Sequence, residues 1–189
     1  MNTDADPRFQ RSRQAILSAA RELLLEKGPV AVTHAQVAER AGLGRATVYR
    51  HWPRPDELLA EAMATVPMPL LDNPTAPTRQ WLTRELTTLA QQLELADVRA
   101  VATTLASTAL WDLQMDTRRA QFAAILSDRL ARALDTAQDR GEVTLAMAVH
   151  DAAAFLVGPI YYRSTIEHGP VGSTLIETLI AAIGTWTTP

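Results

Sequence analysis

The side chains of this chain that are best suited to chemistry are hydrogen-bond donors in the segment that follows Thr33. Arg45 and Arg50 lie there among hydroxyl and imidazole groups. A guanidinium group donates paired hydrogen bonds to a guanine edge, whereas neutral donors mostly bind phosphate oxygens. The pattern therefore predicts contact with double-stranded DNA.

Base contacts are expected from one end of a short helix over about residues 44–51. Arg45 lies near its N-terminus and is the first candidate, and Arg50 is the second. Ala46 is small enough to touch a thymine methyl group. The phosphate candidates are Thr33, Thr47, Tyr49 and His51. Three of these also have structural interpretations. Thr33 can act as an N-cap, Tyr49 can be a half-buried residue of helix packing, and His51 can interact with the dipole at a helix C-terminus.

Two short helices joined by a glycine turn must position these groups. Thr33 offers an N-cap to residues 34–41, Gly42 ends that helix, and Pro53 ends the next one. The residues expected to pack between the two helices are Val37, Ala38, Leu43 and Val48, and Trp52 is expected in the core. This arrangement is a helix-turn-helix, whose second helix enters the major groove.

The charge distribution favours the same part of the chain. The whole chain carries a net charge of −3, but residues 8–54 hold nine Arg and Lys against three Glu, a net charge of +6. The remaining residues carry a net charge of −9. Neutralisation of phosphates supplies most non-specific affinity for DNA, so only the basic part is expected to bind it.

Helical periodicity extends through the rest of the chain and predicts an all-α fold of about nine helices. Four prolines within residues 67–77 indicate a linker. We therefore expect a DNA-binding domain over residues 8–66 and a C-terminal helical domain over residues 78–187. Thr144 is expected to cap a helix that runs to Gly169 with a kink at Pro159.

The segment from Thr33 resembles the TetR (tetracycline-repressor-like) family. The matching residues are Thr33, Val37, Ala38, Ala41, Gly42, Leu43, Thr47, Val48, Tyr49, His51, Trp52, Asp56 and Leu58. Two positions depart from the pattern, because Gly44 replaces a Ser and Pro55 replaces a Lys that contacts phosphate in the family. Arg54 is the candidate substitute for that lysine.

The resemblance implies a C-terminal ligand pocket and a homodimer built from the last two helices. Residues 158–163, GPIYYR, resemble a subclass of the family with the pattern G-P-[IL]-Y-Y-R. An apolar or aromatic ligand is expected, because flexible and aromatic side chains are available to line a pocket. The candidates are Trp81, Trp111, Met115, Phe122, Met147, Phe155, Tyr161 and Tyr162. Packing in the core is the alternative for each of them.

Other classes of protein fit the sequence less well. His150-Asp151 is compatible with a metal-dependent hydrolase, but no cluster of ligands accompanies it, and no enzyme activity, metal or cofactor is expected. A ligand-blind or architectural DNA-binding protein would keep the helix-turn-helix without the pocket. Without cysteine, a signal segment or a long apolar run, the chain is expected in the cytoplasm and off the membrane.

Overall fold

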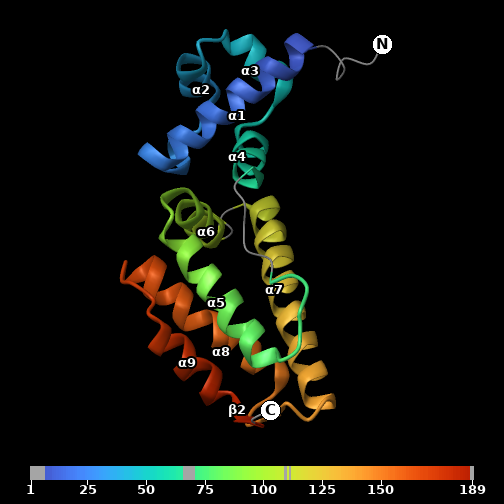
Figure 1. Ribbon diagram of the computed structural model, residues 1–189. Helices are drawn as coiled ribbons and strands as arrows, with labels where there is room; N and C mark the ends of the chain where they lie inside the picture. The colour runs from blue at the N-terminus through green and yellow to red at the C-terminus, as the bar shows by residue number, and fades with distance from the viewer. Residues whose placement is uncertain (1–6, 66–70, 109, 111, 188–189) are drawn as a thin grey trace. The chain divides into compact units, whose positions relative to one another are not determined.

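The computed structural model describes residues 7–65, 71–108, 110 and 112–187, which are mostly helical (Figure 1). The chain forms two compact units, Met1–Pro67 and Met68–Pro189. The elements of the first are α1 (Pro7–Lys27), the 3-10 turn η2 (Pro29–Ala31), α2 (His34–Ala41), α3 (Arg45–His51) and α4 (Pro55–Ala64). The elements of the second are α5 (Thr78–Glu94), α6 (Ala96–Thr108), α7 (Leu113–Asp139), β1 (Val143–Leu145), α8 (Val149–Tyr161), the π-helical turn η3 (Tyr162–Ile166), α9 (Ser173–Ala182) and β2 (Gly184–Trp186).

The core of the N-terminal unit lies along one face of α1, which packs against α2 and α4. That face buries Ile16, Ala19, Ala20, Leu23 and Leu24. Between α2 and α3, Gly42 has a φ of 65°, in the left-handed region that favours glycine. The turn at Gly42 therefore sets the direction in which α3 leaves α2.

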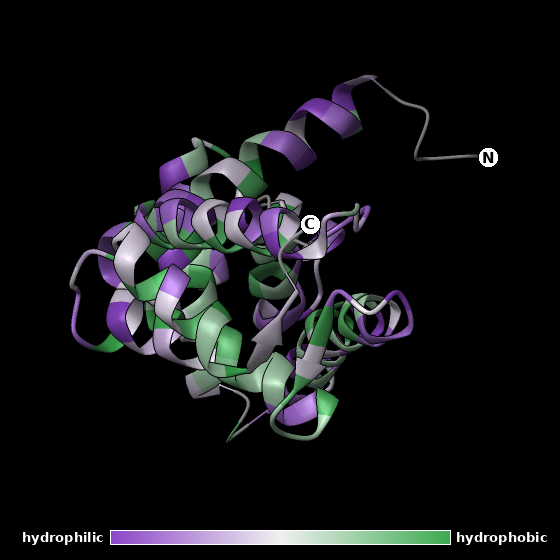
Figure 2. Ribbon diagram, turned by 60° about the horizontal axis from the view of Figure 1, so that its bottom comes forward, coloured by the Kyte–Doolittle hydropathy of each residue, from purple (hydrophilic) through white to green (hydrophobic). Residues whose placement is uncertain are grey.

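The core of the C-terminal unit is built around α5, which contacts α6, α7, α8 and α9. The buried side of α5 carries Trp81, Leu82, Leu86, Leu89 and Leu93. The helices are amphipathic, with hydrophobic and hydrophilic residues on different sides (Figure 2). No helix among the described residues has the length and apolar character needed to cross a bilayer.

The prediction that Thr144 caps a helix is wrong. Thr144 lies in β1 and pairs with Thr185 of β2, and α8 begins at Val149. The two strands approach so closely at Gly184 that a Cβ there would lie 2.3 Å from the Thr144 carbonyl oxygen. Thr144 therefore pairs with a strand that is distant in sequence, which local helical periodicity does not reveal.

The helix predicted to run to Gly169 is divided into two parts. Pro159 lies inside α8, which ends at Tyr161, and the chain continues as the π-helical turn η3. The wider turn is closed by hydrogen bonds from Glu167 N to Tyr162 O (3.1 Å) and from Gly169 N to Arg163 O (2.9 Å). Because proline has no N–H to donate, a change of hydrogen-bonding pattern near Pro159 is expected.

Candidate nucleic-acid interface

The second helix of the helix-turn-helix, α3, presents two different faces. Val48 is fully buried and anchors the helix in the core of the N-terminal unit. Arg45, Ala46 and Arg50 are exposed, and Tyr49 is 53% exposed. One short helix therefore combines an internal anchor with a solvent-facing set of the donors predicted from the sequence.

Several basic side chains of this unit are paired with carboxylates. Arg40 of α2 binds Glu22 (3.3 Å) and Glu26 (2.6 Å) of α1, and this lowers the pKa of Glu26. Arg13 of α1 is paired with Glu61 of α4. These carboxylates partly neutralise the arginines that they bind.

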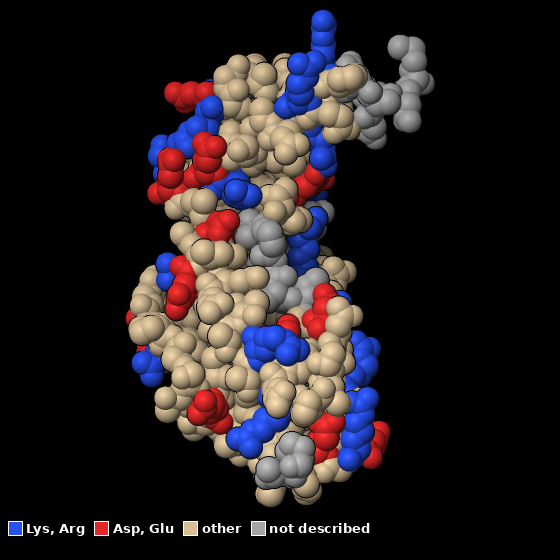
Figure 3. Space-filling model, in the orientation of Figure 1, with Lys and Arg blue, Asp and Glu red and all other residues tan. Residues whose placement is uncertain are grey.

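Arg45 and Arg50 differ from these paired arginines. No ion pair involves either of them within residues 7–65 of the structure. Basic side chains protrude from the upper edge of the N-terminal unit in Figure 3, where Figure 1 places both α3 and the start of α1. Two exposed guanidinium groups on α3 are therefore available to an anionic partner.

Arg54, the candidate substitute for the missing lysine, already has a carboxylate partner. Its Nε donates to Asp56 at 3.1 Å, and a second nitrogen pairs with the other carboxylate oxygen. The Arg54 guanidinium holds the pKa of Asp56 below its usual value. A phosphate would therefore have to compete with Asp56 for this group.

Thr33 and Thr47 are partly buried in the helix-turn-helix. The Thr33 hydroxyl accepts a hydrogen bond from Gln36 N at 3.3 Å, so its predicted N-cap role is confirmed. An N-cap hydroxyl also retains a proton to donate, so a phosphate contact remains compatible with that role.

His51 is more enclosed than its predicted role as a phosphate contact requires. Its Nε2 lies 2.8 Å from Ser12 Oγ, and the Ser12 hydroxyl lies 2.9 Å from the Phe9 carbonyl oxygen, to which it donates. Ser12 has one hydroxyl proton, so Nε2 of His51 must be the donor in their bond. Nδ1 of His51 is buried and has no hydrogen-bond partner among the described residues. The phosphate contact of His51 remains a prediction, and it would require this bond to Ser12 to rearrange.

Sequence reasoning missed the partners that hold the end of α3. Trp52 is 4% exposed, as predicted for the core, and its Nε1 donates to Glu61 Oε2 at 2.7 Å. His34 of α2 lies 2.7 Å from the Trp52 carbonyl oxygen. These partners are distant in sequence and follow no local periodicity, so no signal in the sequence identified them.

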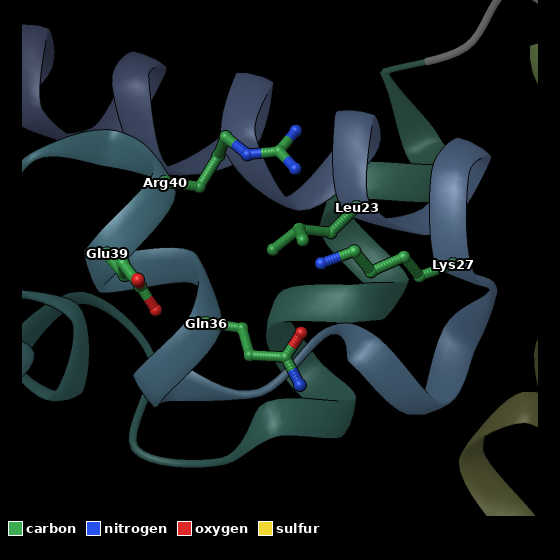
Figure 4. Close-up of a pocket in the computed structure, with 5 residues that line it drawn as sticks. All are labelled: Leu23, Lys27, Gln36, Glu39 and Arg40. Atoms are coloured by element: carbon green, nitrogen blue, oxygen red, sulfur yellow. The ribbon is translucent and has the colours of Figure 1, made fainter.

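A polar cleft of about 370 Å³ lies between α1 and α2 (Figure 4). It is lined by Leu23, Lys27, Gln36, Glu39 and Arg40. The side chains of Lys27 and Gln36 extend into the cleft, and no residue of α3 lines it. This cleft is therefore separate from the exposed donors of α3.

The eight candidate pocket residues of the C-terminal unit are not gathered at one cavity. Phe122 and Tyr161 line a cavity of about 380 Å³ between α7 and α8. Trp81 and Met115 are each 1% exposed and belong to the core. The remaining candidates are Met147, which is half-buried, Phe155 and Tyr162, which are exposed, and Trp111, which lies outside the described residues.

The enclosed ring of His51 predicts a dependence of stability on pH. Burial lowers the pKa of His51, and the nearby charges of Arg50 and Arg13 lower it further. The unfolded chain therefore binds this proton at a higher pH than the folded chain, so acid favours unfolding. We expect the free energy of unfolding, measured in urea, to fall as the pH drops below about 6.5.

His51→Gln should reduce this dependence on pH, and His168→Gln, at an exposed site in the other unit, should leave it unchanged. An equal pH dependence in His51→Gln and the parent protein would contradict the assignment to His51.

Comparisons with known proteins place the chain in a family. Residues 16–62 match the bacterial regulatory proteins of the tetR family, and residues 73–183 match the tetracyclin repressor-like C-terminal domain. The HTH-type transcriptional regulator YdeS of Bacillus subtilis is 28% identical over 179 residues, which cover 92% of this chain and 88% of YdeS.

Solved structures share the fold. NalD of Pseudomonas aeruginosa, the secondary repressor of a multidrug efflux pump, matches with a TM-score of 0.75 at 20% identity, over 95% of this chain and 98% of that chain. SmeT, the repressor of a Stenotrophomonas maltophilia multidrug efflux pump, matches with a TM-score of 0.72 at 22% identity. The match covers 92% of this chain and 90% of that chain. The chain belongs to the TetR family of DNA-binding transcriptional regulators.

Proposed function

We propose that the protein is a homodimeric repressor that binds a palindromic operator and is released by a small apolar or aromatic ligand. The observation that carries the DNA contact is the exposure of the guanidinium groups of Arg45 and Arg50, which form no ion pair within residues 7–65, on a helix anchored by Val48. Because the proposed target is operator DNA, we propose that the protein acts in the cytoplasm.

The exposed face of α3 supports a division of roles. Arg45 is the first residue of α3, where base contacts concentrate in helix-turn-helix proteins, and we assign it to base edges. Arg50 is a second candidate for bases, and Ala46 for a thymine methyl group. The proposed phosphate contacts are Thr33, Thr47, Tyr49, His51 and Arg54.

Removal of the Arg45 guanidinium tests the proposed base contact. We expect Arg45→Ala to weaken binding to a duplex selected by the protein from a random library by about tenfold or more, because a bidentate base contact contributes about 1–3 kcal/mol. Fluorescence anisotropy at several salt concentrations measures this. Arg118→Ala, at an exposed site on α7, is the matched control. Unchanged affinity for the selected duplex in Arg45→Ala would remove Arg45 from the interface.

The proposal of a homodimer rests on an exposed stripe along α8. The small residues Ala154 and Gly158 lie on it beside the larger Phe155, and it continues to Tyr162 at the start of η3. Phe155 and Tyr162 are 39% and 54% exposed. A Cβ at Gly158 would meet no atom within 4 Å, although glycine inside a helix costs about 1 kcal/mol relative to alanine. No neighbouring atom in the described part of the protomer requires a small residue here. A second copy packed closely against α8 would require one.

A bulky side chain at Gly158 should disrupt such a dimer. We expect Gly158→Leu to raise the dimer dissociation constant about tenfold or more, because overpacking at a close helix contact costs about 1–3 kcal/mol. Sedimentation equilibrium measures this constant. Ala106→Leu adds a similar side chain to the exposed side of α6 and should leave the dimer unchanged. A Gly158→Leu dimer as stable as that of the parent would rule out this interface.

The cavity between α7 and α8 supports the proposal of a ligand. Its volume of about 380 Å³ is in the range of small-molecule sites, and its lining is mostly apolar. Phe122, Leu126 and Tyr161 contribute to that lining. SmeT, which shares the fold, has been solved as a complex with triclosan. We also assign residues 158–163 to the G-P-[IL]-Y-Y-R subclass, because they match its pattern, and Gly158 and Tyr161 of this segment line the cavity.

Filling the cavity tests this site. We expect triclosan, or another compound from a panel of apolar aromatic molecules, to raise the melting temperature of the parent and to release DNA. Ala123 and its neighbour Ala124 are both exposed on α7, but only Ala123 lines the cavity. Ala123→Trp should therefore abolish the shift, and Ala124→Trp should retain it. A panel that neither stabilises the parent nor releases DNA would favour a ligand-blind regulator.

A further inference from the structure

We propose that His34 is a positioning residue for DNA binding, which holds the ring of Tyr49 so that its hydroxyl meets a phosphate. The inference rests on the proposed phosphate contact of Tyr49. His34 is the first residue of α2 and is 5% exposed, so it does not itself reach a partner in solution.

The orientation of the His34 ring is fixed by one hydrogen bond. Its Nε2 lies 2.7 Å from the carbonyl oxygen of Trp52, the C-cap residue of α3. A carbonyl oxygen only accepts, so Nε2 carries the proton and donates it. The bond also satisfies a carbonyl group at the end of α3 that has no partner within the helix. His34 therefore ties the start of α2 to the end of α3.

The same ring supports Tyr49. The centroids of the two rings are 3.9 Å apart, with an interplanar angle of 27°, so the rings are stacked. Tyr49 is 53% exposed, and an exposed side chain without such support would sample several rotamers. Ordering such a side chain opposes binding, so a ring that is already held in place binds more tightly.

The hydrogen bond and the stacking together make His34 more than a core residue. An aliphatic side chain at this position would fill the same space, but it would leave the Trp52 carbonyl without a donor. It would also give Tyr49 no flat surface. One partner of His34 lies on α3 and the other is its C-cap residue, so the ring couples the placement of that helix to the orientation of the tyrosine on it.

A double-mutant cycle tests the proposal in the full-length protein, with the duplex that the protein selects from a random library. Tyr49→Phe removes the hydroxyl alone, and its loss of affinity tests the proposed phosphate contact separately. His34→Gln keeps an N–H donor for Trp52 and removes the ring. We expect His34→Gln to weaken binding about three- to tenfold, the range that an aromatic pair contributes.

In the Tyr49→Phe background, the same His34→Gln change should alter affinity by less than about twofold, because residues that act through one contact are not additive. An equal loss in both backgrounds would show that His34 acts through the fold alone and would overturn the proposal. Unchanged affinity in His34→Gln would overturn it as well.

His34→Phe provides a second route if the melting temperature of His34→Gln shows that it is poorly folded. Phenylalanine keeps the stacked ring and loses the donor. We expect His34→Phe to bind DNA within about threefold of the parent and to remain sensitive to Tyr49→Phe. If Tyr49→Phe had no effect in the His34→Phe background but weakened the parent, support of Tyr49 by ring stacking would be excluded.

Discussion

Trp52 lies at the C-terminal end of α3, and side chains from three other helices hold it there. Its Nε1 donates to Glu61 of α4, and its carbonyl oxygen accepts from His34 of α2. Arg13 of α1 lies over the indole ring, with its Cζ atom 5.6 Å from the ring centroid, and it also pairs with Glu61. A seven-residue helix such as α3 makes few hydrogen bonds of its own, so its position depends on these tertiary contacts.

Contacts between helices also determine how much positive charge the N-terminal unit presents to a partner. Its net charge of +6 over residues 8–54 overstates what a partner would meet, because Arg13 and Arg40 are paired with carboxylates on neighbouring helices. Such partly exposed pairs contribute little to stability, but they reduce the positive potential near α1 and α2. Arg45 and Arg50 carry no such pair within residues 7–65, so their positive charge stays available on a helix that the fold exposes.

Local signals in the sequence were sufficient for the helix-turn-helix and insufficient for its surroundings. Thr33, Gly42 and Pro53 act on residues within one helical turn, so the bounds of α2 and α3 were predictable within a residue. The bond between Ser12 and His51 spans 39 residues, and β1 pairs with a strand about 40 residues away. Partners at that distance depend on how the helices pack, which hydrophobic periodicity does not specify.

Pocket residues were the least predictable for a related reason. Trp81 and Phe122 are both aromatic and both lie on amphipathic helices, yet Trp81 packs in the core and Phe122 lines a cavity. Composition cannot separate them, because burial depends on the shape of the space that neighbouring helices leave.

The cavity and the proposed dimer face share Ala154 and Gly158, both of which line the cavity and are exposed on α8. On our proposal, a molecule in the cavity would touch the same helix turn that the partner subunit packs against. A ligand shifts an equilibrium only by binding one state better than another. Because Ala154 and Gly158 are shared, a change in the packing of the dimer against α8 would also change the lining of the cavity. Ligand binding and dimerisation would then be coupled within the C-terminal unit through α8 itself.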